Sequence, residues 1–161
     1  MREILFRGKR CDNGKWVEGY LYVTHNGEYE IGRYNAEVNI ERMTYVVDPD
    51  TVGQYTGLTD KNGKRIFEGD IVKQTFEKTV AVASDEFWDD NGYADLYGED
   101  VGKVVILPSK GTCIKNPVIH REVNGEITED RANARMYKNV CSGRCEIIGN
   151  IHDNPELLKG E

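Results

Sequence analysis

Asn-Gly dipeptides constrain this sequence more than any other feature, because Asn-Gly favours the tight type I′ turn that joins neighbouring antiparallel strands. Four of the five dipeptides lie between segments with strand-like composition. The clearest predicted hairpin pairs residues 16–24 with 28–34, and a second pairs residues 118–123 with 126–128. The sequence therefore predicts a mainly β, antiparallel fold. The five dipeptides are Asn13-Gly14, Asn26-Gly27, Asn62-Gly63, Asn91-Gly92 and Asn124-Gly125.

Further segments complete the predicted secondary structure. Residues 103–107 are the most apolar and predict a central strand, and residues 145–148 predict another. Gly69 allows a sharp bend where a further strand begins. Near the C-terminus, Asn154 is suited to the N-cap and Pro155 to the first position of a short helix.

Two other segments are less regular. Residues 129–137 are compatible with two helical turns. Residues 84–102 are acidic and contain glycine, so we expect an exposed loop or insertion there.

Length and charge limit the class of protein. A chain of 161 residues suits one domain that folds without disulfides or metal. The net charge is −7, and residues 85–100 hold seven acids with no Lys or Arg, so the rest of the chain is neutral. A neutral body lacks the broad basic face of a non-specific nucleic-acid binder.

The sequence contains no apolar run approaching the ~18 residues of a membrane span, and no signal peptide is recognisable. We therefore expect a cytoplasmic protein without membrane association. Its four cysteines are then reduced thiols.

The candidate metal-binding motifs do not have the spacing or ligand residues that such sites require. Cys141 and Cys145 form one loose pair, whereas a zinc ribbon needs two close pairs. An EF-hand alignment on Gly92 puts Phe87 at the first ligand position and Gly98 at the last, where acids are required. The alignment matches at Asp89, Asn91 and Asp95.

Three histidines, His25, His120 and His152, are present, but no nucleophile elbow or phosphate loop accompanies them. The sequence predicts neither an enzyme nor a cofactor or metal site.

Binding surfaces are the remaining candidates. Aromatic side chains on the predicted strands could stack on nucleic-acid bases, and the basic residues in 2–15 could bind phosphates. The same pattern also fits aromatic residues in the core and charged residues on a solvated face. Phe87 and Trp88 lie inside the acidic segment and pack either on their own domain or on a partner. A polar set near the Asn62 turn is a candidate functional surface, with turn formation as its alternative explanation. That set is Gln54, Tyr55, Thr56, Asp60, Lys61 and Asn62.

Several specific motifs occur in order along the chain. They are Phe6-Arg7-Gly8-Lys9 with Asn13-Gly14-Lys15-Trp16-Val17, Val52-Gly53-Gln54-Tyr55-Thr56-Gly57-Leu58, Asp60-Lys61-Asn62-Gly63-Lys64, Phe67-Glu68-Gly69-Asp70-Ile71-Val72 and Ile147-Ile148-Gly149-Asn150-Ile151-His152-Asp153-Asn154-Pro155-Glu156-Leu157-Leu158. Together they resemble the YopX family of phage and prophage proteins. The resemblance implies a single domain over residues 1–161, with a family-like core in 1–75 and 143–158 and a variable insertion in 77–142. It also implies an SH3-like small barrel with hairpin additions and a short C-terminal helix, and a tendency to form homo-oligomers. It supplies no catalytic residues.

These observations favour a non-enzymatic phage accessory protein that binds a host or phage protein and acts as a homo-oligomer. One alternative is a nucleic-acid-associated protein that uses the basic N-terminal segment. Another is an acidic decoy that binds a host protein through residues 85–100.

Overall fold

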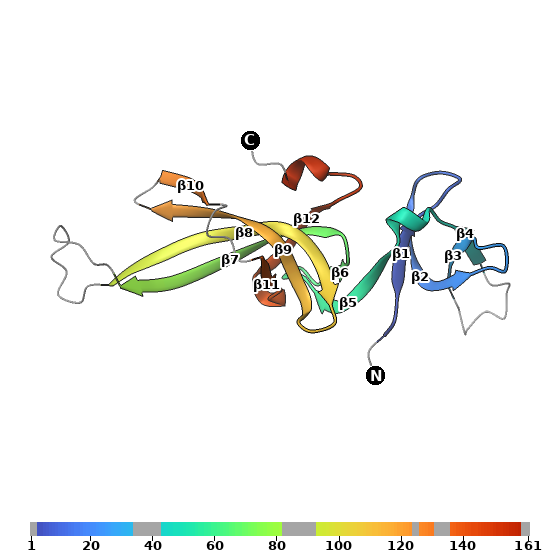
Figure 1. The fold of residues 1–161 in the computed structure, drawn as a ribbon, viewed down its shortest axis with the longest axis horizontal. Helices are drawn as coiled ribbons and strands as arrows, with labels where there is room; N and C mark the ends of the chain where they lie inside the picture. The colour runs from blue at the N-terminus through green and yellow to red at the C-terminus, as the bar shows by residue number, and fades with distance from the viewer. Residues whose placement is uncertain (1–2, 34–42, 82–92, 124–125, 131–135, 159–161) are drawn as a thin grey trace.

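The computed structural model describes residues 3–33, 43–81, 93–123, 126–130 and 136–158 (Figure 1). Within these residues the chain is mainly β, as predicted, and its strands form two antiparallel sheets. None of the helical segments in this part of the chain has the length and apolarity to cross a lipid bilayer.

The first sheet has the strand order β4-β3-β2-β1-β5-β6 among the described residues. Its strands are β1 (Phe6–Lys9), β2 (Trp16–Val23), β3 (Tyr29–Arg33), β4 (Met43–Val46), β5 (Gly53–Thr59) and β6 (Arg65–Phe67). The predicted hairpin around Asn26-Gly27 is confirmed by the pairing of β2 with β3.

The second sheet has the order β10-β9-β8-β7-β12, and β11 also pairs with β9. Its strands are β7 (Asp70–Ala81), β8 (Tyr93–Leu107), β9 (Gly111–Val123), β10 (Glu126–Asp130), β11 (Tyr137–Asn139) and β12 (Cys145–Asn150). The predicted hairpin of β9 with β10, the central strand at 103–107 and the strand at 145–148 are all confirmed.

Two separate apolar cores divide the molecule into lobes. The N-terminal lobe, β1 to β4, is built around Val17, Ile31 and Val47. The C-terminal lobe, β5 to β12, is built around a core to which the β5–β6 hairpin and the second sheet both contribute. That core contains Ile66, Val72, Val104, Ile114 and Cys145. Figure 1 shows the blue N-terminal lobe on one side and the long strands of the C-terminal lobe extending away from it.

The SH3-like barrel is not confirmed, because neither sheet closes within the described residues. The first sheet does curl: a bridge joins Arg10 to Val47, so the chain after β4 returns to the end of β1. The sheet does not close further, because β5 pairs with Phe6 and Arg7 along the same edge of β1.

The turn positions were predicted well, but the turn type was wrong at the three described Asn-Gly sites. Gly14, Gly27 and Gly63 have φ of 67°, 80° and 80°, whereas the sole described non-glycine residue with positive φ is Asn116. Type I′ needs positive φ at both central residues. The Gly27 and Gly63 loops instead have three residues, with the left-handed glycine last, as in a type I turn followed by a G1 bulge.

Two further expectations need correction. Residues 93–102 belong to β8 and are not a loop. Glu129 and Asp130 are in β10 and Tyr137 begins β11, so the described ends of the expected 129–137 helix are strands. At the expected C-terminal helix, Pro155–Leu158 form a short 3-10 helix, so an α-helix there is not confirmed.

Candidate functional site

Segments far apart in the sequence meet where the two lobes touch. β1 and β2 contribute basic and indole side chains, β6 and β7 contribute a phenyl ring and a carboxylate, and the end of β12 with the turn after it contributes the rest. We call this set the interlobe cluster. Its members are Arg7, Lys9, Trp16, Phe67, Asp70, Asn150, His152 and Asp153.

Arg7 lies at the centre of the interlobe cluster. Its guanidinium carbon is 4.8 Å from the Trp16 ring centroid and 5.1 Å from that of Phe67. Its Nη1 is 2.5 Å from Asp70 Oδ1, and the Phe67 N–H donates to Asp70 Oδ2 at 2.7 Å. Burial raises the pKa of Asp70, although the Arg7 charge opposes that rise.

Asp153 fixes the turn after β12 to the N-terminal lobe. Its carboxylate accepts hydrogen bonds at 2.8 Å from Asn150 Nδ2 and Trp16 Nε1, and pairs with the Lys9 ammonium. These donors hold the pKa of Asp153 well below its usual range. The His152 ring centroid lies 5.9 Å from that of Trp16.

The contacts of the interlobe cluster join the two lobes. The carboxylates of Asp70, which is buried, and of Asp153, which is at the surface, are both engaged by donors from the protein itself. Burial, together with the Lys9 and Arg7 charges, lowers the pKa of His152.

The predicted site residues Gln54, Tyr55 and Thr56 lie in β5, not on the loop where they were expected. Gln54 pairs with β1, and the Tyr55 ring lies 5.5 Å from that of Phe67. Thr56 is buried, and its hydroxyl donates to the Ile66 carbonyl at 2.8 Å. The Tyr55 ring and the Thr56 hydroxyl therefore contact the C-terminal lobe, whereas the backbone of Gln54 joins that lobe to β1.

Asp60 does lie in the β5–β6 hairpin loop, but its side chain points inward and is 5% exposed. Its Oδ1 accepts the N–H groups of Asn62 and Lys64 at 2.9 Å, and its Oδ2 accepts that of Ile147 at 3.2 Å. Burial raises the pKa of Asp60, yet these three donors outweigh it and leave the pKa below its usual value.

Lys61 and Asn62 are exposed at the tip of the same loop. Lys61 Nζ lies 2.6 Å from Glu146 Oε2, and the Lys61 N–H donates to the Cys145 carbonyl at 2.9 Å. The loop is therefore tied to β12. Phe87 and Trp88, the other predicted binding residues, lie outside the described residues.

The acidic segment continues into strand β8. Asp95 pairs with Thr79 of β7, which also removes it from an EF-hand loop. Glu99 lies 3.3 Å from Lys73, and the carboxylate of buried Asp100 pairs with Lys138. The charges of Glu99 and Asp100 are therefore matched within the protein.

Three basic residues of the N-terminal segment are similarly paired with acids. Arg7 and Lys9 pair with acids of the C-terminal lobe, and Arg10 forms two hydrogen bonds to Asp12, at 2.9 and 2.5 Å. These pairs leave little free positive charge on β1 for phosphates.

Cysteine and histidine residues are dispersed. The four cysteines are free, and no group of three His, Cys, Asp or Glu side chains in the described ranges could hold a metal ion. His25 lies in the β2–β3 turn and His120 in β9, whereas His152 belongs to the interlobe cluster.

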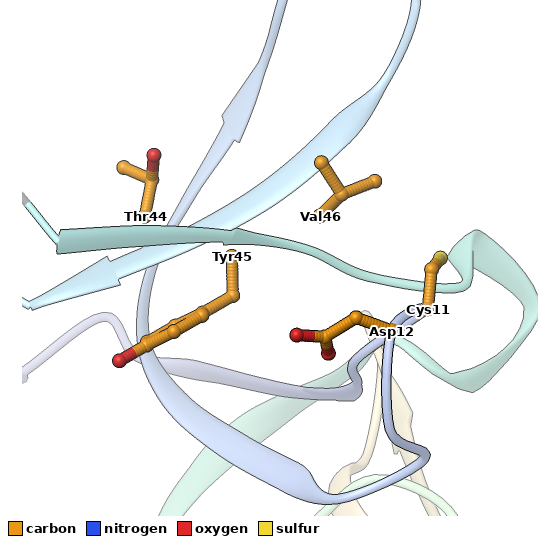
Figure 2. Close-up of a pocket in the computed structure, with 5 residues that line it drawn as sticks. All are labelled: Cys11, Asp12, Thr44, Tyr45 and Val46. Carbon is orange, nitrogen blue, oxygen red and sulfur yellow. The ribbon is translucent and has the colours of Figure 1, made fainter.

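A cavity of about 390 Å³ lies between β4 and the turn after β1, at the edge of the first sheet as the described residues form it. In Figure 2, Tyr45 and Asp12 lie on one side of β4, and Thr44 and Val46 on the other. The Arg10 guanidinium stacks 3.8 Å from the Tyr45 ring centroid. The lining residues are Cys11, Asp12, Thr44, Tyr45 and Val46.

Sequence reasoning did not identify this edge. The available signal was the uncharged run at residues 43–47, which is unusual for an exposed edge strand.

A family model described as YopX protein matches residues 5–159, nearly the whole chain. The match runs through residues 77–142, which supply most of the second sheet. Comparison with curated proteins gives no match. The chain belongs to the YopX family.

Proposed function

We propose that this protein is a non-enzymatic binding module that self-associates through the open edge of β4. It acts as a phage or prophage accessory protein in the host cytoplasm. The observation that carries the proposal is an uncharged edge strand that lines a cavity and has exposed apolar side chains beside it. The engagement of Asp60, Asp70 and Asp153 in internal contacts supports binding over catalysis.

The ladder between β3 and β4 identifies the outward backbone groups of β4. The Val47 N–H donates to the Tyr29 carbonyl, and hydrogen-bonded pairs alternate along an antiparallel ladder. Thr44 and Val46 therefore direct their backbone groups away from β3. The Val46 carbonyl accepts from the Cys11 N–H at 3.0 Å, and the chain turns away from β4 beyond that bond.

Apolar side chains surround this edge. Met43 is 63% exposed and Val46 is 40% exposed, on opposite faces of β4. Tyr20, which is 44% exposed, lies in the same cross-strand row as Thr44. An uncharged edge strand with exposed apolar neighbours is a template for pairing with another strand.

A second copy of the chain suits this edge. A two-fold axis brings the same strand of each copy together in antiparallel orientation, so both ladders are completed by identical residues. Exposed side chains from both faces of the strand are then buried between the copies.

Sedimentation velocity over a range of protein concentrations tests the proposal. We expect the native chain to self-associate and Val46→Lys to be monomeric, because the lysine places a charge on the edge. Ile148→Lys is the matched control, since Ile148 is 37% exposed on edge strand β12. A monomeric native chain, or a Val46→Lys variant that associates normally, would contradict the proposal.

A further inference from the structure

The two lobes do not share an apolar core. The core of the N-terminal lobe and that of the C-terminal lobe have no member in common among the described residues. The lobes are therefore held together by something other than continuous hydrophobic packing.

The backbone connection between the lobes is narrow. β1 and β5 are paired at Phe6 with Gln54 and at Arg7 with Gly53, and the Tyr55 N–H donates to the Leu5 carbonyl at 2.7 Å. The ladder between the lobes therefore spans two residue pairs and one further hydrogen bond.

Ion pairs, hydrogen bonds and aromatic contacts join side chains of the two lobes. Arg7 pairs with Asp70, while Lys9 and Trp16 both bind Asp153. A second group lies at Arg65, whose guanidinium nitrogens are 3.6 Å from Glu3 and from Glu18. Salt weakens such contacts where they are exposed, as the Arg65 pairs and the Lys9–Asp153 pair are, and acts less on the buried Arg7–Asp70 pair.

The closed arrangement also carries an energetic cost. Nε and Nη2 of Arg7 are buried and have no hydrogen-bond acceptor among the described residues. Asp70 is 1% exposed, so its carboxylate is almost fully removed from water. Buried donors without acceptors and desolvated charges both oppose closure.

From this balance we infer that the interlobe cluster is an ionic clasp on a hinge at the β1–β5 contact. The lobes separate as rigid bodies when the charged contacts across the cluster are weakened. Separation exposes Trp16, Phe67 and Arg7, while each lobe keeps its own core. This conformational change is independent of self-association at β4.

Trp16 reports directly on the clasp. The chain has two tryptophans, so a Trp88→Phe background leaves Trp16 as the reporter. Adding salt to this protein is expected to shift the Trp16 emission to longer wavelength and to increase quenching by acrylamide. The far-UV circular dichroism is expected to stay constant, and small-angle X-ray scattering to show a larger radius of gyration.

Asp153→Asn in the same background is expected to show these changes already at low salt. Glu99→Gln is the matched control, because the Lys73–Glu99 pair lies within one lobe and is similarly exposed. It is expected to behave like the background protein.

Three results would overturn the inference: Trp16 emission and radius of gyration that stay constant with salt, an Asp153→Asn variant indistinguishable from the background, or loss of secondary structure whenever Trp16 becomes exposed. The last result would show that the lobes unfold as one cooperative unit. The salt titration needs no clasp substitution, so it decides the question even where a variant does not fold.

Discussion

Removing the Asp60 carboxylate should destabilise the whole C-terminal lobe. The side chain accepts the backbone N–H groups of Asn62 and Lys64 within its own loop and that of Ile147 in β12. Asp60→Ala leaves all three donors without their acceptor. The effect therefore reaches from the β5–β6 loop to the edge of the second sheet.

The size of the effect follows from these three bonds. A buried donor left without its acceptor costs about 1–3 kcal/mol, and water can reach the two loop donors more easily than the Ile147 donor. We expect Asp60→Ala to lower the free energy of unfolding by about 3 kcal/mol, a large share of the roughly 5–15 kcal/mol typical of a domain. In Asp60→Asn, the side-chain oxygen can still accept the two loop N–H groups, but the NH2 group faces the Ile147 N–H and cannot accept from it. We expect this variant to lower the free energy of unfolding by about 1–2 kcal/mol.

Urea unfolding followed by circular dichroism measures the difference. Asp12→Ala is the control, because Asp12 also lies in a hairpin loop but its carboxylate is 60% exposed and pairs with Arg10 at the surface. We expect that variant to unfold like the native chain. An Asp60→Ala variant as stable as the native chain would refute the structural role assigned to this carboxylate.

Two other predictions concern pH and a close backbone approach. The pKa values of Asp60 and Asp153 lie below their usual range in the folded state, so the stability they supply is present above about pH 4 and is lost as the pH falls through the folded pKa values. Unfolding experiments at pH 2–6 should show this loss, with a shallower slope for Asp153→Asn; an unchanged slope would contradict it. A Cβ on Gly53 would meet the Glu68 carbonyl oxygen at 2.3 Å, so Gly53→Ala should lower the thermal midpoint, whereas Gly143→Ala, which meets nothing within 4 Å, should not. Equal midpoints for the two variants would argue against this contact.

Local sequence signals correctly located turns and strands, because turns and strands depend mainly on residues that are neighbours in the sequence. Asn26-Gly27 correctly located the turn between β2 and β3, and the apolar run at 103–107 correctly located a central strand. The glycines of β8 misled the prediction. The Phe76 ring covers Gly98, where a Cβ would meet it at 2.4 Å, so this glycine serves strand packing and not a turn.

The candidate sites depended on contacts between distant residues, which spacing does not show. Asp60 was singled out as a polar loop residue, but its bond to Ile147 spans 87 positions. In the sequence, Arg7 belongs to a basic segment. Its ion pair with Asp70 depends on how β1 and β7 lie in the fold, which residue spacing does not show. The open edge of β4 depends on which strands pair, and the sequence left that undetermined.

Amide hydrogen exchange followed by NMR at low and high protein concentration tests the proposed β4 edge most directly. We expect the Thr44 and Val46 amides, which face away from β3, to become more protected as concentration rises. The Tyr45 amide, which faces β3, should be protected at both concentrations. Thr44 and Val46 exchange rates that do not change with concentration, in a chain that does associate, would contradict it and direct attention to another surface.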